Sequence, residues 1–170
     1  MNSQIITKAD IITLLHSNNI DNQLTAISEI RKNGDGDLLK QLLNLLLSAQ
    51  DFQVVREILR CISDLKDPNM LHILIESIQN PLFSSKKREI LHALWQTNFD
   101  CSAYCDYFIS LIYTDSFEIG IEALTLLDVS CEYLSESIKS KYKNELMTYC
   151  NSTTDEQQLA LINQAIDLLQ

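Results

Sequence analysis

Four residues that could bind a metal ion lie in the second half of the chain: His92, Cys101, Cys105 and Cys131. Thiolates and imidazoles are good zinc ligands, but a structural zinc site needs four of them converging on one point. Cys101 and Cys105 are four positions apart, and no second close pair accompanies them. Cys105 also falls on the apolar stripe of its expected helix, where cysteine behaves as a small hydrophobic residue. We therefore interpret these cysteines as core side chains and expect no metal site.

Catalysis of hydrolysis would need one of three histidines, His16, His72 or His92, beside a nucleophile and an orienting acid. The sequence contains no G-x-S-x-G, H-E-x-x-H, Walker A or G-x-G-x-x-G motif. His72 is expected to be exposed on a helix, and His92 lies between Leu91 and Ala93, which are expected to pack in the core. We predict no catalytic residue, no cofactor and no enzymatic activity.

The strongest compositional anomaly is an aromatic and acidic segment. Seven of the 12 aromatic residues lie in the range 95–117, and no Lys or Arg occurs between Arg88 and Lys139. Trp95, Tyr104 and Phe108 are expected to pack in the core. Tyr107 and Tyr113 are expected to lie off the buried stripe, beside acidic residues, as is typical of a surface that binds basic or aliphatic protein segments. The alternating Lys139, Lys141 and Lys143 are interpreted as solvated surface.

Charge and composition restrict the partners. The formal charge is −10, from 13 basic and 23 acidic residues, so DNA, RNA and anionic membranes are disfavoured. No basic segment with a cleavage site opens the chain, and no apolar run approaches the ~20 residues that span a bilayer. The five cysteines are scattered. These features predict a cytoplasmic protein with reduced thiols.

The elements that would position such side chains are helices. The chain has only three glycines and two prolines, too few for most β folds. A small residue followed by a large one recurs at Ala26, Cys61, Ala93, Ala123 and Ala165, at spacings of 35, 32, 30 and 42 residues. Periods of this size are typical of helical repeat arrays.

Between these small–large pairs, the expected second helix of each helix pair carries apolar residues at i, i+1, i+4, i+5 and i+8. Residues at this spacing share one helical stripe. Asp67-Pro68 is expected to separate two helices, Ser84-Ser85 to cap the next, and Thr153-Thr154-Asp155 to start the last. The predicted elements are a leading helix at ~8–17, helix pairs at ~22–32/37–48, ~52–66/69–79, ~85–97/102–114 and ~117–130/134–150, and a closing helix at ~155–169.

The segment from Val55 to Ile78 resembles a HEAT repeat. Its stretch L-x-D-P-x-x-L-x-x-L-I-x-x-I, residues 65–78, is similar to the turn and second helix of bacterial, phycobilin-lyase-like HEAT repeats. The resemblance covers about residues 21–150. It implies an all-α, right-handed α-solenoid of stacked antiparallel helix pairs, which we expect to form a single domain over residues 1–170.

Such a family includes scaffolds, adaptors, regulators and a few enzymes, so the fold does not assign a function. A bilin-lyase-like protein would need a tetrapyrrole pocket, which the sequence does not identify. A DNA-repair-like protein would need a cationic groove, whereas the second helices offer Lys40, Glu76 and Asp106. A third alternative is a fragment of a longer array, which would expose apolar residues among Ile5, Ile6, Leu168 and Leu169.

We therefore expect a non-catalytic protein-binding module, that is, an adaptor, scaffold or regulatory subunit. The partner would be a protein or peptide with basic or aliphatic residues, and neither a nucleic acid nor a membrane. The resemblance implies that second helices line the concave side and bind the partner. The expected binding residues are Lys40, Gln41, Asn44, His72, Ile73, Glu76, Asp106, Tyr107, Ser110 and Tyr113.

Overall fold

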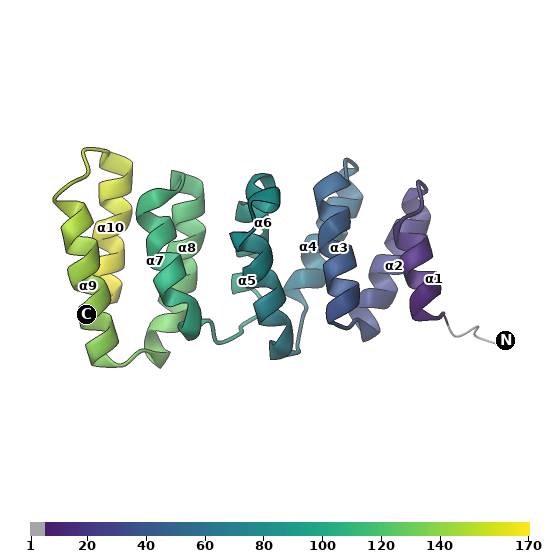
Figure 1. Ribbon diagram of the computed structural model, residues 1–170, viewed down its shortest axis with the longest axis horizontal. Helices are drawn as coiled ribbons and strands as arrows, with labels where there is room; N and C mark the ends of the chain where they lie inside the picture. The colour runs from purple at the N-terminus through teal and green to yellow at the C-terminus, as the bar shows by residue number, and fades with distance from the viewer. Residues whose placement is uncertain (1–5) are drawn as a thin grey trace. The chain divides into compact units, whose positions relative to one another are not determined.

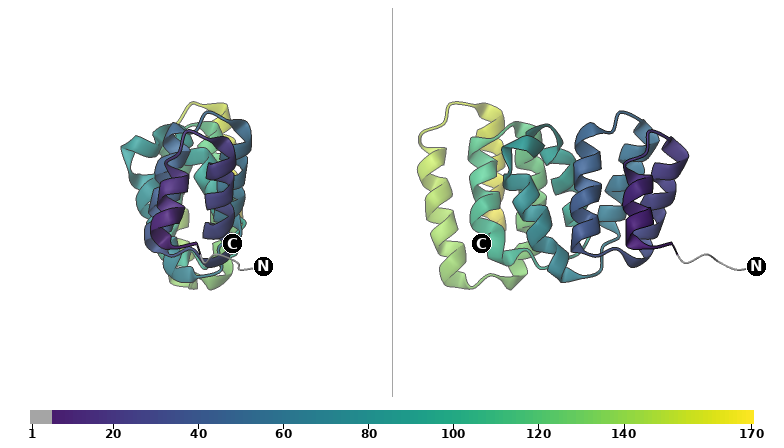
Figure 2. Two further views of the ribbon diagram at one scale, coloured as in Figure 1. Left: turned by 90° about the vertical axis from the view of Figure 1, so that its right-hand side faces the viewer. Right: turned by 45° about the vertical axis from the view of Figure 1, so that its right-hand side comes forward.

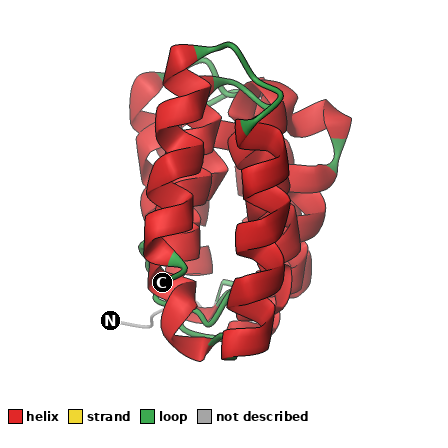
Figure 3. Cartoon of the chain, turned by 90° about the vertical axis from the view of Figure 1, so that its left-hand side faces the viewer, coloured by secondary structure: helices red, strands yellow, loops and turns green. Residues whose placement is uncertain are grey.

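The computed structural model describes residues 6–170, in which ten α-helices and four short 3-10 helices occur without any strand (Figures 1 and 3). The all-α class predicted from the sequence is thereby confirmed for this part of the chain. None of these helices is long and apolar enough to cross a membrane. The chain divides into two compact units, Met1–Thr97 and Asn98–Gln170, each with its own helical packing.

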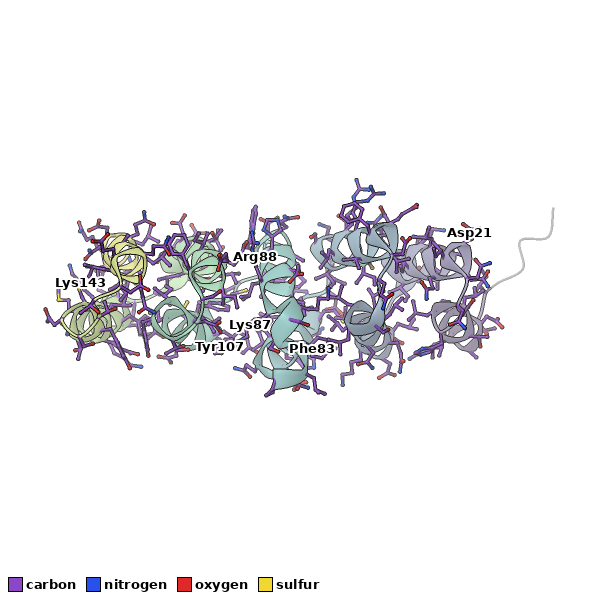
Figure 4. The ribbon with its side chains drawn as sticks, turned by 90° about the horizontal axis from the view of Figure 1, so that it is seen from above. Asp21, Phe83, Lys87, Arg88, Tyr107 and Lys143 are labelled. Carbon is purple, nitrogen blue, oxygen red and sulfur yellow. The ribbon has the colours of Figure 1, made fainter. Side chains whose placement is uncertain are left out.

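The first unit is built of two layers of helices (Figures 2 and 4). In one layer α2 packs on α4 and α4 on α6, and in the other α1 packs on α3 and α3 on α5. The helices are α1 (Lys8–Leu15), α2 (Ile20–Asn33), α3 (Gly36–Ser48), α4 (Phe52–Ser63), α5 (Leu71–Gln79) and α6 (Lys87–Trp95), with 3-10 helices η1 (Pro68–Met70) and η2 (Pro81–Lys86).

The core of this unit follows the predicted pattern. The small residues Ala26, Cys61 and Ala93 are at most 2% exposed where α2, α4 and α6 stack, because a small side chain lets neighbouring helices approach closely. Leu42 on α3 and Leu74 on α5 are fully buried. The repeated stripe of the second helices is therefore the buried stripe.

Polar residues begin most helices of this unit. Asp51 accepts hydrogen bonds from two backbone amides of α4, and Asp67 caps η1, with Pro68 at its first position. The expectation that Ser84-Ser85 cap the third pair is wrong. Both residues lie inside η2, which Asn80 caps, and η2 runs directly into α6 without a side-chain cap at Lys86.

The second unit has two layers as well. Here α7 packs against α9 and α8 against α10, and α10 also contacts α9 and α7. Gly120 lies in the α8–α10 contact, where a β-carbon would come within 2.8 Å of Leu161 Cδ1. Asp155 caps the last helix, as predicted. The elements are η3 (Ser102–Tyr104), α7 (Cys105–Thr114), α8 (Phe117–Ser130), η4 (Cys131–Tyr133), α9 (Glu136–Cys150) and α10 (Glu156–Leu168).

The burial of Leu74 provides a test of the first unit's core. Leu74→Ala should lower the free energy of unfolding by about 2–5 kcal/mol, since it removes apolar contacts and leaves a cavity. Leu82→Ala is the matched control, because Leu82 is 74% exposed in the same unit; it should change stability by at most about 0.5 kcal/mol. Urea unfolding followed by circular dichroism measures both. Equal effects of the two variants would contradict this packing.

Candidate binding surfaces

The ten expected binding residues fall on three helices. Lys40, Gln41 and Asn44 lie on α3, and His72, Ile73 and Glu76 on α5, all in the first unit. The remaining four lie on α7 in the second unit. The two groups form different environments.

On the first unit, a hollow of about 240 Å³ lies between α3, α5 and the start of η2, and we call it the α3–α5 hollow. It brings four of the expected residues together from helices about 30 positions apart in the sequence. Its floor is apolar and its rim is polar and exposed. The lining residues are Lys40, Leu43, Asn44, Ile73, Glu76, Ser77, Asn80 and Phe83.

The polar side chains on the rim of this hollow have unused capacity for hydrogen bonds and ion pairs. The side chains of Lys40, Asn44 and Glu76 are exposed and make no hydrogen bond or ion pair with another described residue. Asn80 uses its Oδ1 to accept from the backbone amide of Leu82 at 3.0 Å, which leaves its NH₂ group as a donor. The hollow thus offers a cation, an anion and two amides above apolar side chains.

Ile73 was expected at the surface, and this expectation is wrong. Only 4% of the residue is exposed, because α5 packs on α3 and places the Ile73 side chain against Gly36, where a β-carbon would lie 2.9 Å from Ile73 Cδ1. Ile73 instead forms part of the apolar floor together with Leu43 and Phe83, whose place on η2 is marked in Figure 4. A partner would contact it only by inserting a side chain.

The other two expected residues of this unit lie outside the hollow. Gln41 Oε1 is 3.0 Å from Nε2 of His16, the C-cap residue of α1, so the Gln41 side chain already connects α3 to the end of α1. His72 is exposed on α5, as predicted.

On the second unit, the expected binding residues of α7 are largely engaged by α9. Asp106 Oδ1 accepts from Lys141 Nζ at 3.0 Å. The Tyr113 ring stacks on Tyr149 with centroids 3.5 Å apart, and its hydroxyl donates to Glu145 at 3.0 Å. Tyr113 is thus held against α9, whereas Asp106 is exposed, as expected, and pairs with Lys141 at the surface.

Sequence reasoning missed these contacts because the partners are distant along the chain. Lys141 is exposed, as expected for solvated surface, and it also pairs with an acid 35 positions earlier. One base that pairs with the aromatic, acidic segment thus comes from α9. Burial and the neighbouring Glu145 carboxylate raise the pKa of Tyr113, so its hydroxyl stays protonated and continues to donate.

Two residues of α7 remain on its half-exposed face. Tyr107 lies on the side of α7 that is turned away from α8 (Figure 4), with its ring tilted against Phe108 at a centroid distance of 6.3 Å. Ser110 Oγ donates to the Tyr107 carbonyl at 2.7 Å. Trp95 and Tyr104 are half-exposed rather than buried as expected. Trp95 lies edge-on to the His92 ring instead, at 5.4 Å between centroids.

The cysteines lie where apolar side chains would lie. Cys101 is 1% exposed and Cys105 is fully buried, which supports their interpretation as core residues. Burial raises the pKa of both thiols to about 12 and that of Cys61 to about 11. All five cysteines are free thiols. Among residues 6–170, no three His, Cys, Asp or Glu side chains are grouped as metal ligands.

A second hollow, which sequence reasoning did not find, lies between α8 and α10. It has a volume of about 380 Å³, and we call it the α8–α10 hollow. Leu168, one of the residues considered for an exposed array end, lines it, whereas Leu169 is 3% exposed and Ile6 is 37% exposed. Ile5 lies outside the described residues. The lining residues are Leu124, Thr125, Asp128, Gln164, Asp167 and Leu168.

The contacts of Tyr113 predict a structural role. Tyr113→Ala should destabilise the protein by about 1–3 kcal/mol, because it removes a part-buried ring stack and a hydrogen bond to a charged acceptor. Tyr133→Ala is the control, since Tyr133 is 58% exposed in the same unit. Thermal or urea unfolding of both variants measures the difference. A Tyr113→Ala protein as stable as the control would show that α7 and α9 do not pack in this way.

The buried thiols predict selective reactivity. In the native protein at pH 8, a thiol reagent should modify Cys150 first, because it is the partly exposed cysteine. The other four should react only on unfolding, since desolvation keeps buried thiols protonated. Mass spectrometry of labelled peptides checks the order in which the cysteines react; rapid native labelling of Cys105 would contradict it.

The raised pKa values of the buried thiols also predict that the free energy of unfolding falls as the pH rises above about 9, because the thiols then ionise in the unfolded chain but not in the folded one.

Comparison of the sequence with models of known protein families and with curated proteins gives no match. The function must therefore be inferred from the residues and surfaces of this chain.

Proposed function

We propose that this protein is a non-catalytic protein-binding module built of HEAT-like helix pairs in a solenoid arrangement. Its binding site would be the α3–α5 hollow, and its role that of an adaptor, scaffold or regulatory subunit. The single observation that carries the proposal is the meeting of Lys40, Asn44 and Glu76 around an apolar floor, with their polar groups unsatisfied by the chain itself.

The chemistry of the hollow suits an extended peptide. Asn44 and Asn80 carry amide groups that can pair with the C=O and N–H groups of a peptide backbone. The floor of Leu43, Ile73 and Phe83 suits one aliphatic side chain of the partner. Burying that side chain would supply most of the affinity, and the amides would fix the peptide's direction.

The charged residues of the rim would select the flanking residues of the peptide. Glu76 on α5 would attract a Lys or Arg, and Lys40 on α3 an acidic residue or a C-terminal carboxylate. Because the two charges have opposite sign, they contribute to orientation and specificity more than to net attraction. A DNA-repair-like function gains no support from this mixed rim, since duplex binding depends on clustered cations.

A selection experiment tests the proposal. A displayed library of random short peptides is selected on the full chain, and the enriched peptides are measured by fluorescence anisotropy. The Asn44→Ala, Glu76→Ala double variant should bind them about tenfold or more weakly, because truncation of central interface residues costs ~1 kcal/mol or more each. Circular dichroism should stay unchanged, since both side chains are exposed.

The matched control is the double variant Gln53→Ala, Lys66→Ala, which removes two exposed side chains of the same unit outside the hollow. It should bind the selected peptides as tightly as the unmodified protein. Equal affinity of both double variants for every selected peptide would refute the α3–α5 hollow as the binding site.

A further inference from the structure

The charge of the chain is concentrated in its second unit. Residues 98–170 contain three Lys or Arg and twelve Asp or Glu, a formal charge of −9, whereas residues 1–97 contain ten and eleven, a charge of −1. Two of the three bases are already paired within the unit, Lys139 with Glu136 and Lys141 with Asp106. The second unit therefore attracts cations over its surface.

In the α8–α10 hollow of this unit, negative potential meets apolar surface. Asp128 and Asp167 are exposed at its edge, and none of its six lining residues is basic. The Asp128 carboxylate makes no ion pair or hydrogen bond with a described residue, and the Asp167 carboxylate accepts a hydrogen bond from the Gln170 side chain. Neither carboxylate is neutralised.

Helix polarity adds to this potential. Asp128 lies in the last turn of α8, and Asp167 and Leu168 lie in the last turn of α10. The carboxyl end of a helix carries a partial negative charge that favours Lys or Arg nearby, yet neither helix has a basic residue in its last turn. The carboxyl ends of two helices and two carboxylates therefore favour a cationic group of a partner at this hollow.

The apolar part of the hollow indicates that the partner is not a simple cation. Leu124 and Leu168 line the hollow on facing helices. Ile121 and Val129, one turn to either side of Thr125 on α8, are 40% and 43% exposed and extend the apolar surface. An aliphatic side chain of a partner would cover Leu124 and Leu168 while its neighbours reach the carboxylates.

We propose that the α8–α10 hollow is a second binding site, which takes a protein segment in which an aliphatic side chain is flanked by Lys or Arg. This site is separate from the α3–α5 hollow and differs from it in charge, since that rim carries one cation and one anion whereas this one carries two anions. A nucleic acid or an anionic membrane would be repelled by the same carboxylates.

Methyl NMR of the full chain tests the proposal with defined peptides. The probe is the blocked peptide Gly-Arg-Leu-Lys-Gly, and its controls are Gly-Arg-Ser-Lys-Gly and Gly-Glu-Leu-Glu-Gly. The probe should shift the methyl signals of Leu124 and Leu168 at lower peptide concentrations than those of Leu43 and Ile73, because Lys40 on the rim of the α3–α5 hollow repels one of its two bases. Each control should bind about fivefold or more weakly, because it lacks either the apolar contact or the charge complementarity.

Charge-matched variants separate this site from general attraction. The Asp128→Asn, Asp167→Asn double variant should bind the probe about fivefold to tenfold more weakly, since two ion pairs are lost without a change in shape. The control variant Glu132→Gln, Glu156→Gln removes the same charge from exposed positions outside the hollow and should keep most of the affinity.

Three outcomes would overturn the proposal. The probe could cause no shift at Leu124 and Leu168, the serine peptide could bind as tightly as the leucine peptide, or the two charge-matched variants could weaken binding equally. None of these outcomes affects the α3–α5 hollow, which is tested with different peptides and variants.

Discussion

Close packing of helices on small side chains is the constraint on which each unit depends. Ala26, Cys61 and Ala93 are almost completely buried where α2, α4 and α6 stack, and Gly120 plays the same part between α8 and α10. A larger residue at any of these positions would push two helices apart and expose the stripes that they bury. The close approach of these helices determines how their layers pack.

The two hollows arise from the way such layers end at the surface. Each hollow lies between two helices of one layer, and the residues that line it determine its chemistry. In the first unit, Asn44 and Glu76 leave mixed polar groups above Leu43 and Ile73. In the second, Asp128 and Asp167 leave only negative charge above Leu124 and Leu168. The same architecture therefore yields two binding chemistries.

Sequence reasoning predicted the helices well because their signals are local. The buried stripe of α5, the Asp67-Pro68 turn and the Asp155 cap are each encoded within a few residues. Packing between distant segments was harder to predict. Ile73 is buried because it meets Gly36, and Tyr113 is engaged because Glu145 and Tyr149 arrive from α9. No local sequence pattern encodes these contacts, since each depends on the register of one helix against another.

The contacts of α7 also bear on how the chain is made. Tyr113 stacks on Tyr149 and donates to Glu145, and its carbonyl accepts from Gln158 Nε2 at 2.6 Å. All three partners leave the ribosome after α7, at a synthesis rate of about 5–20 residues per second. For those seconds the nascent chain carries an aromatic, acidic helix without its cover.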